Sequence, residues 1–241
     1  MNIGIIFAGG VGSRMHSKDK PKQFLNIFDK PIIIHTLSFF QNNQDIDAII
    51  IACHPDYLDL MAELTEKYHM TKVERIVPGG TTGQLSIYAG LKAAKEVAAG
   101  EKAIVLIHDG VRPLINSELL SENITAVQKY GSCITAGVVK ETIVTIDESH
   151  DIEQVPSRIH SRVAKAPQSF WLEDILKVHE QALRNGEQNH IDSCTLMNRY
   201  GHPLHMIDGP DENIKITTPG DFFAMRAILE ARENEQIYTE E

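Results

Sequence analysis

Short apolar runs alternate with longer amphipathic segments in the first half of this chain. Apolar runs of strand length lie at 3–8, 48–53, 72–77, 103–107 and 133–139. Helix-like patterns lie between several of them, at 31–42, 56–68 and 82–98. This alternation predicts βαβ units and a mainly parallel sheet that is covered on both faces. We therefore expect an α/β fold, in a Rossmann-like three-layer α/β/α arrangement.

The segment at about 138–165 breaks this rhythm. Residues 138–146 reach a polar turn at 147–151 and return through 152–156, a pattern that predicts a β-hairpin. A lone hairpin is marginally stable in water, so it needs a second subunit or a helix of the same chain to pack against. Further helices are expected at 172–185, 192–200 and 221–233, with a strand-like alternation at 213–217. We expect one domain over residues 1–241 that carries the hairpin as an arm.

Three polar loops that contain glycine follow three of the predicted strands. They are Gly9-Gly10-Val11-Gly12, the run from Gly79 to Gln84 with Ser86 at the start of the next helix, and the run from His108 to Pro113. The carboxyl ends of strands in open α/β sheets form one edge, and ligands bind there. Glycine lets backbone N–H groups approach phosphate closely, although an ordinary tight turn explains the first cluster equally well. Neither the P-loop nor the dinucleotide fingerprint occurs here.

Basic residues gather beside the first loop although the chain as a whole is acidic. The sequence has 23 Lys and Arg against 33 Asp and Glu, a formal net charge of -10. That balance argues against broad binding to nucleic acid or to an anionic membrane. Arg14, Lys18, Lys20 and Lys22 are a local exception, offset only by Asp19. Such a cluster suits a small anionic ligand in one basic pocket.

Composition adds limits on size and compartment. A chain of 241 residues with 42% hydrophobic residues can build a sizeable core. Its apolar runs fall short of the roughly 20 residues of a membrane span, and the N-terminus does not read as a secretion signal, so we expect a cytoplasmic protein. Cys53, Cys133 and Cys194 fit neither a disulfide framework nor a Cys-x-x-Cys metal site, and we expect buried thiols.

Individual charged residues beyond the first loop allow two interpretations each. Asp109, at a strand end, suits a ribose hydroxyl or a divalent cation, or it is a turn residue. Arg112 suits a phosphate, or it pairs with Asp109. Lys215 could meet a triphosphate or be solvated, and Arg158 and Lys165 are expected as surface cations. The histidines form no metal set and the serines no nucleophile elbow, so covalent catalysis is not indicated.

Six short motifs in order resemble the 2-C-methyl-D-erythritol 4-phosphate cytidylyltransferase family, which includes ribitol-5-phosphate cytidylyltransferases. The motifs are Ala8-Gly9-Gly10, Gly12-x-Arg14-Met15, Pro21-Lys22-Gln23, His108-Asp109-x-x-Arg112-Pro113, Pro167-Gln168 and Asn213-Ile214-Lys215-Ile216-Thr217. The resemblance runs nearly from end to end of the chain. It implies a nucleotidyltransferase that couples CTP to a polyol phosphate, releases pyrophosphate and uses Mg²⁺ or another divalent cation.

The resemblance also implies roles for particular residues. The catalytic cations would be Arg14, Lys22 and Lys215. The nucleotide site would comprise Ala8, Gly9, Gly10, Gly12, Gly80, Ser86 and Asp109, with Asp109 beside the ribose or the metal. The acceptor phosphate would meet Arg112, Thr142 and Arg158. In this family the last two reach the neighbouring subunit's site, which implies a homodimer that exchanges its hairpin arms.

Three departures from the family pattern bear on the acceptor and the base. Gly83 stands where many isoprenoid-pathway members have arginine, Ala166 replaces the usual threonine, and Lys140-Glu141-Thr142 replaces Arg-Asp-Thr. These changes favour ribitol 5-phosphate or a related polyol phosphate over methylerythritol phosphate. The alternatives are a methylerythritol phosphate cytidylyltransferase, another sugar-phosphate nucleotidyltransferase and a non-catalytic nucleotide-binding protein.

Overall fold

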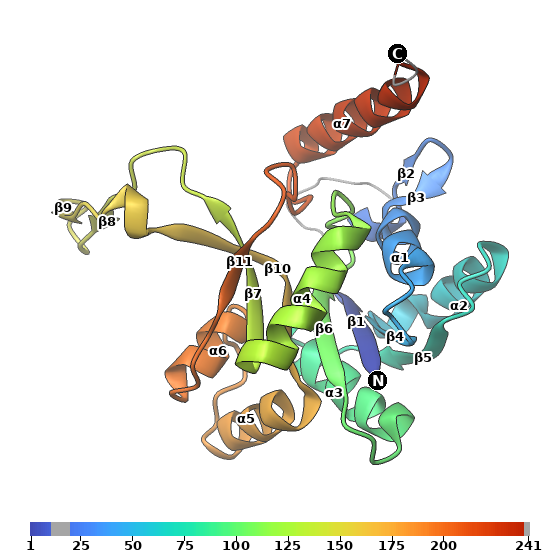
Figure 1. Ribbon diagram of the computed structural model, residues 1–241, viewed down its shortest axis with the longest axis horizontal. Coiled ribbons are helices and arrows are strands. Elements are labelled where there is room, and N and C mark those ends of the chain that lie inside the picture. Colours follow the sequence, from blue (N-terminus) through green and yellow to red (C-terminus); the bar gives the residue numbers. More distant parts are fainter. Residues whose placement is uncertain (11–19, 239–241) are drawn as a thin grey trace.

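A seven-stranded mixed sheet forms the centre of the protein (Figure 1). The structure is a computed structural model, and it describes residues 1–10 and 20–238. The strand order is β11-β7-β10-β6-β1-β4-β5. The strands are β1 (Asn2–Ala8), β4 (Ala48–Cys53), β5 (Val73–Pro78), β6 (Ile104–Asp109), β7 (Ser132–Val138), β10 (Arg162–Trp171) and β11 (Met206–Asp208). Only β10 runs antiparallel to its neighbours in this sheet, which confirms the mainly parallel α/β prediction.

Helices cover both faces of this sheet. One face packs against α1 (Ile32–Asn42), α2 (Leu58–Lys67) and α4 (Ser117–Tyr130). The other packs against α3 (Gly83–Ala98), α5 (Leu172–Arg184) and α6 (Ser193–Arg199). Strands β4 and β6 are buried along their whole length. Their apolar runs at 48–53 and 104–107 suit strands that are covered on both faces. The three layers of the prediction are therefore present.

Short elements and a last helix complete the chain. The 3₁₀ turns are η2 (Lys22–Phe24), η3 (Pro55–Tyr57) and η4 (Arg158–His160). A small ladder joins β2 (Asn26–Ile27) to β3 (Lys30–Pro31). The closing helix α7 (Pro219–Tyr238) begins beside a separate apolar cluster that includes Ile27, Leu114 and Met225. In the part of the chain that the structure describes, no helix combines the length and apolarity needed to cross a membrane.

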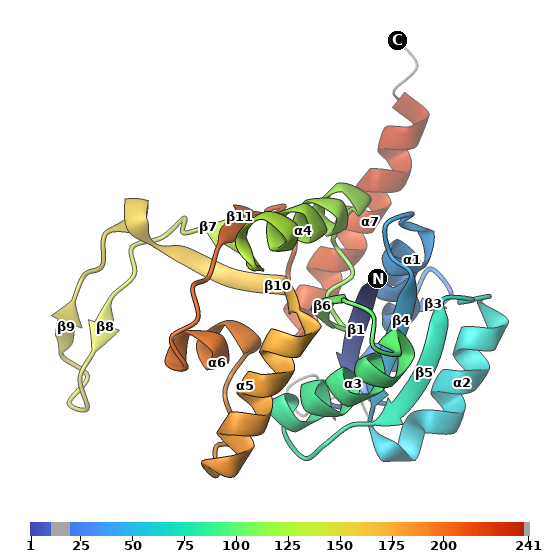
Figure 2. The same ribbon diagram turned by 60° about the horizontal axis from the view of Figure 1, so that its bottom comes forward.

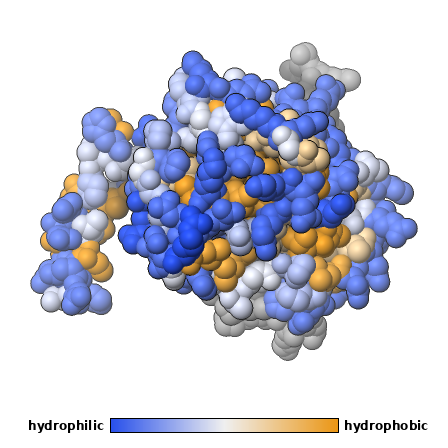
Figure 3. Space-filling model, turned by 90° about the horizontal axis from the view of Figure 1, so that it is seen from below, coloured by the Kyte–Doolittle hydropathy of each residue, from blue (hydrophilic) through white to orange (hydrophobic). Residues whose placement is uncertain are grey.

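The predicted hairpin is an arm that extends away from the sheet (Figures 1 and 2). Its tip pairs β8 (Thr145–Ile146) with β9 (Ile152–Gln154) in antiparallel register. Large hydrophobic side chains are exposed along it (Figure 3), namely Val138, Ile143, Val144, Ile146, Ile152, Val155, Ile159 and Val163. In the described chain these side chains are not covered by the sheet or its helices.

Several elements differ from the prediction, among them the edge strand β11, which was not predicted. Helix α4 and the antiparallel strand β10 were not predicted, although β10 is central to the sheet. The expected strand at 213–217 is an irregular segment. Its alternation has another cause, because Ile216 is fully buried and its N–H donates to the Val111 carbonyl at 2.9 Å. The buried isoleucine holds this segment against the loop that follows β6.

Candidate active site

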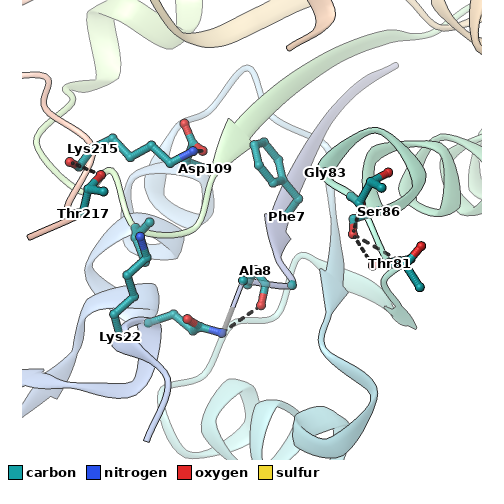
Figure 4. Close-up of a pocket in the computed structure, with 15 residues that line it drawn as sticks. Phe7, Ala8, Lys22, Thr81, Gly83, Ser86, Asp109, Lys215 and Thr217 are labelled. Atoms are coloured by element: carbon teal, nitrogen blue, oxygen red, sulfur yellow. Dashed lines mark hydrogen bonds and ion pairs between the residues drawn. The ribbon is translucent and has the colours of Figure 1, made fainter. Parts of the chain in front are cut away.

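The carboxyl ends of β1 and β6 lie side by side and carry the first site residues. Phe7 pairs with Asp109 across these strands, and Ala8 pairs with Cys53 of β4 on the other side. The loop between β5 and α3 reaches the same edge. Together these segments enclose a cavity of about 350 Å³ (Figure 4). Its lining includes Ala8, Gly9, Gly10, Lys22, Gly80, Gly83, Ser86, Asp109, Lys215 and Thr217.

Ser86 organises the glycine side of this 350 Å³ cavity, which we call the donor cavity after the substrate that the family resemblance would place there. Its hydroxyl accepts a hydrogen bond from the Gly80 N–H at 3.1 Å and donates to the Thr82 carbonyl at 2.9 Å. A Cβ on Gly9 would lie 3.1 Å from the Ser86 hydroxyl, and a Cβ on Gly80 would lie 2.3 Å from Leu85 Cβ. Glycine is therefore required at Gly80 for close packing, whereas Gly10 and Gly83 border open space.

Lys22 and Gln23 bring a cation to the opposite wall. Both lie in η2 and are buried, and the Gln23 amide donates to the Ala8 carbonyl at 2.9 Å. This bond fixes the 3₁₀ turn against the end of β1. Lys22 also lies near Asp221 in the first turn of α7. Burial would raise the pKa of Asp221, but hydrogen bonds from Thr218 and Thr217, and then the charge of Lys22, lower it below its usual value.

Asp109 is a buried carboxylate held between two cations. Its Oδ1 lies 2.6 Å from Lys215 Nζ, and its Oδ2 lies 3.2 Å from Arg112 Nε. Burial alone would raise the pKa of Asp109, but the positive charges of Lys215 and Arg112 outweigh it, and the pKa lies below its usual value. Asp109 is therefore ionised at neutral pH. Figure 4 shows Lys215 extended toward this carboxylate across the donor cavity.

A second cavity of about 240 Å³ adjoins the first. We call it the acceptor cavity after the substrate that the family resemblance would place beside Arg112. The two cavities share Phe7, Gly83, Asp109 and Lys215. Residues that line only the acceptor cavity include Arg112, Lys165, Gln168, Asp192 and Ser193. Asp109 and Lys215 thus lie at the boundary between the two cavities.

Two cations of the acceptor cavity are held by the segment before Lys215. Arg112 donates to the Asn213 carbonyl at 3.0 Å, and Lys165 Nζ donates to the Pro210 and Asp211 carbonyls at 3.1 Å each. Burial and then the charge of Arg112 lower the pKa of Lys165. A phosphate group would offset the repulsion between these two cations, and both side chains are fixed before any ligand binds.

The loop between α5 and α6 links the two cavities. Gln84, at the start of α3, donates to the Glu187 carbonyl at 2.9 Å and accepts from the His190 N–H at 2.8 Å. The same loop ends at Asp192, whose Oδ2 accepts from the Gln168 amide at 3.0 Å. The position of Asp192 therefore depends on both α3 and β10.

The predicted site residues fall into three groups. The structure brings Ala8, Gly9, Gly10, Lys22, Gly80, Ser86, Asp109 and Lys215 to the donor cavity, and Arg112 to the acceptor cavity. Gly12 and Arg14 lie outside the described residues. Thr142 and Arg158 are exposed on the arm and line neither cavity of their own chain.

Sequence reasoning assigned no role to four acceptor-cavity residues. Lys165 was expected as a surface cation, Gln168 was only part of a motif, and Asp192 and Ser193 were expected only at the start of a helix. The sequence signal at Asp192 is that of a helix N-cap, and its Oδ1 does accept from the Thr195 N–H at 2.7 Å. A capping pattern predicts a helix start and does not reveal a cavity.

The described residues offer limited protein ligands for a divalent cation. They contain no cluster of three or more His, Cys, Asp or Glu side chains that could hold a metal. Asp109 is the single carboxylate among the described residues of the donor cavity, and both its oxygens contact cations. This donor set fits Mg²⁺ that is bound mainly by substrate phosphates and water with one carboxylate, a common arrangement for that ion.

The fold and these adjoining cavities are those of an α/β protein with a ligand site at the carboxyl edge of its sheet. Residues 3–231 match the family described as "IspD: 2-C-methyl-D-erythritol 4-phosphate cytidylyltransferase". The chain belongs to this family of nucleotidyltransferases.

Individual relatives agree with this assignment. The chain is 53% identical over 238 residues to a ribitol-5-phosphate cytidylyltransferase of Streptococcus agalactiae serotype III, which covers 99% of both chains. It is 36% identical over 229 residues to a 2-C-methyl-D-erythritol 4-phosphate cytidylyltransferase of Clostridium botulinum, with 95% of this chain and 97% of the relative covered. The crystal structure of 4-diphosphocytidyl-2C-methyl-D-erythritol synthase from Anaerococcus prevotii superimposes with a TM-score of 0.82 at 30% identity, covering 95% and 96% of the two chains.

Proposed function

We propose that this protein transfers CMP from CTP to a polyol phosphate, with ribitol 5-phosphate the favoured acceptor, and releases pyrophosphate. The observation that carries the proposal is the pair of adjoining cavities that share Asp109 and Lys215. A reaction between two phosphorylated substrates needs two such sites in contact. The 53% identity to a ribitol-5-phosphate cytidylyltransferase, against 36% to a methylerythritol phosphate enzyme, supports the choice of acceptor.

The reaction requires that the two phosphate groups be positioned for attack and that positive charge stabilise them. An oxygen of the acceptor phosphate attacks the α-phosphorus of CTP, a new P–O bond forms, and the bond to the β-phosphate oxygen breaks so that pyrophosphate leaves. The acceptor phosphate is largely ionised at neutral pH, since such groups have a second pKa of about 6, and no general base is needed. Holding both phosphates in line and stabilising their charge supplies most of the catalysis.

The residues divide between the two substrates. Lys22, Lys215 and Arg14 would hold the triphosphate, and the loops at Gly9, Gly10, Gly12 and Gly80 with Ser86 would surround the nucleoside. Arg112 and Lys165 would hold the acceptor phosphate at the boundary. Asp109 is placed to keep Lys215 and Arg112 apart at a fixed spacing. Mg²⁺, when bound by the phosphates and Asp109, would neutralise charge on the phosphate oxygens.

We further propose a homodimer in which Thr142 and Arg158 enter the partner subunit's acceptor site. Both residues lie on the exposed arm, beyond the cavities of their own chain. The exposed hydrophobic side chains of the arm support this arrangement, because a second copy of the chain would cover them.

The decisive assay measures pyrophosphate release with CTP and Mg²⁺ against ribitol 5-phosphate, methylerythritol 4-phosphate and glycerol 3-phosphate in parallel. We expect turnover to be fastest with ribitol 5-phosphate. Faster turnover with methylerythritol 4-phosphate would make that compound, and not ribitol 5-phosphate, the favoured acceptor. If none of the acceptors supports turnover although CTP binds measurably, a non-catalytic nucleotide-binding protein would be favoured.

Lys22 gives a test of the donor site. We expect Lys22→Ala to lower kcat by a factor on the order of 100, comparable to the loss of one preorganised donor to the reacting phosphates. The measurement is pyrophosphate release under saturating CTP. Lys177→Ala, which removes an exposed cation of α5, is the matched control and should keep wild-type turnover. Near-normal release by Lys22→Ala would refute the assignment.

A further inference from the structure

Strand β10 leaves its regular pairing with β7 at the wall of the acceptor cavity. The pairing runs to Ala164 and resumes at Gln168, so residues 165–167 lie opposite Thr135 alone. A bulge of this kind aims a side chain away from the regular pleat, and bulges are frequent beside active sites. Its first residue is Lys165, which lines the acceptor cavity.

Hydrogen bonds fix the backbone of this bulge. The Gln168 amide donates to the Lys165 carbonyl at 3.2 Å, and the Asn213 amide donates to the Ala166 carbonyl at 2.8 Å. Asn213 is fully buried, and its own carbonyl accepts from Arg112. The point from which the Lys165 side chain starts is therefore fixed relative to Arg112.

Gly137 of β7 leaves the space in which the Lys165 side chain lies. A Cβ at this glycine would lie 2.6 Å from Lys165 Cε, 3.0 Å from Nζ and 3.5 Å from Cδ, and these are the nearest atoms it would meet. The φ of Gly137 lies outside the left-handed region, so its backbone does not require glycine. Glycine also weakens the interior of a strand. The close approach of Lys165 is the reason that the structure gives for a glycine here.

The ammonium at the end of this side chain lies near Arg112. It donates to the Pro210 and Asp211 carbonyls, and an ammonium has a third N–H that can reach a phosphate oxygen. After burial, the charge of Arg112 is the largest influence that lowers the pKa of Lys165, so the two cations are close. Arg112 is paired with Asp109, whereas the hydrogen bonds of the ammonium to described residues all go to neutral carbonyls. An anion in the acceptor cavity would supply the missing negative charge.

We propose that Gly137 is a positioning residue for the acceptor: it leaves room for Lys165 to keep its ammonium beside Arg112, where the two cations bind the acceptor phosphate together. This inference rests on the proposed cytidylyltransferase function and explains how one of its phosphate ligands is placed. A side chain at Gly137 would displace the flexible lysine. Arg112 would stay in place, because Asp109 and Asn213 hold it.

The test measures pyrophosphate release by the full-length protein with Mg²⁺, while ribitol 5-phosphate and CTP are varied in turn. We expect Lys165→Ala to raise KM for ribitol 5-phosphate roughly tenfold or more, the effect of one lost hydrogen bond from a charged donor. Gly137→Ala should raise the same KM by about threefold to tenfold, because a displaced lysine keeps part of its attraction for the phosphate. KM for CTP should stay within about twofold of the wild-type value in both variants.

The Lys165→Ala background supplies the matched control. If Gly137 acts only through the lysine, Gly137→Ala has no further effect there, and the double variant matches Lys165→Ala within about twofold. The Tm of Gly137→Ala should stay close to that of the wild type, since the new Cβ meets the end of a flexible side chain. If Gly137→Ala unfolds instead, the double variant must regain the Tm of Lys165→Ala, because the atoms in conflict are then absent.

The outcomes distinguish this inference from the function on which it rests. Wild-type turnover with ribitol 5-phosphate combined with an unchanged acceptor KM in Gly137→Ala would overturn the inference and leave the cytidylyltransferase function intact. An equal rise in KM for CTP would also overturn it, as would a rise in acceptor KM or a loss of Tm that persists in the Lys165→Ala background. Absence of wild-type turnover with every polyol phosphate would overturn both.

Discussion

Two buried histidines, His179 and His108, contribute to the protein's response to acid. His179 is 1% exposed, neither of its ring nitrogens has a partner among the described residues, and its ring stacks on Tyr88. Burial, and then the nearby His190, lower the pKa of His179 to about 4. Burial likewise lowers the pKa of His108 to about 4. Both side chains are neutral in the folded protein at neutral pH.

We expect stability to fall as pH falls from about 6.5 to 4. In this window the unfolded chain binds a proton at each of these histidines and the folded chain does not, so acid favours unfolding. One such histidine changes the free energy of unfolding by about 1.4 kcal/mol for each pH unit. His179→Leu should remove its share of that slope in urea unfolding measured across the window.

The exposed His150 provides the control for this prediction. It lies at a φ of 68° in the turn of the arm, and Asn tolerates that backbone conformation. His150→Asn should show the wild-type dependence of unfolding free energy on pH. A His179→Leu slope equal to that of the wild type would contradict the account.

At the scale of elements, the N-terminus of α3 and the loop before α6 act as one unit. Gln84 is 3% exposed and makes both of its hydrogen bonds to that loop. Thr82, the N-cap of α3, adds a bond to the Gln188 carbonyl at 2.6 Å. These bonds couple the wall of the donor cavity to Asp192 and Ser193.

We expect Gln84→Ala to lower the free energy of unfolding by about 1 kcal/mol, because it leaves partly buried backbone groups of Glu187 and His190 without these partners. KM for the acceptor should rise as Asp192 loses its support. Urea unfolding and acceptor kinetics measure the two effects. Gln41→Ala, at a more exposed pair of hydrogen bonds, should lower stability less and leave the acceptor KM unchanged. Full stability in Gln84→Ala would be evidence against this coupling.

The elements also show how far the sequence predicts the structure. Five of the parallel strands, and the site loops that follow β1, β5 and β6, were predictable, because apolar runs and the glycines or charges directly after them are local signals. Strand β10 was not, since it is antiparallel and contains Pro167, and its place between β6 and β7 is fixed by tertiary pairing. Lys165, Asp192 and Ser193 reach the acceptor cavity through this pairing and through the α5–α6 loop. No local pattern connects them to Asp109.

At the scale of the whole molecule, the arm places part of the predicted acceptor site far from the chain's own cavities. Arg158 donates to the Lys140 carbonyl within the arm at 3.3 Å, and the arm projects away from the sheet (Figure 2). A partner of the same sequence would bring an identical arm, and two-fold symmetry would complete both sites at once. In the proposed dimer each site therefore depends on residues of both subunits, whereas in a monomer with a solvated arm it would not.

Mixing two inactive variants tests this arrangement. Arg158→Ala lacks the residue that the arm would donate, and Lys22→Ala lacks a cation of the donor cavity. In a mixed dimer, the Arg158→Ala subunit keeps its own Lys22 and receives an intact arm from its partner, so one of the two sites is complete. After free exchange of equal amounts, about half of the dimers are mixed, and roughly a quarter of wild-type activity should return. Pyrophosphate release by the mixture would be compared with that of each variant alone, and a mixture as inactive as its parents would show that each site is built from one subunit.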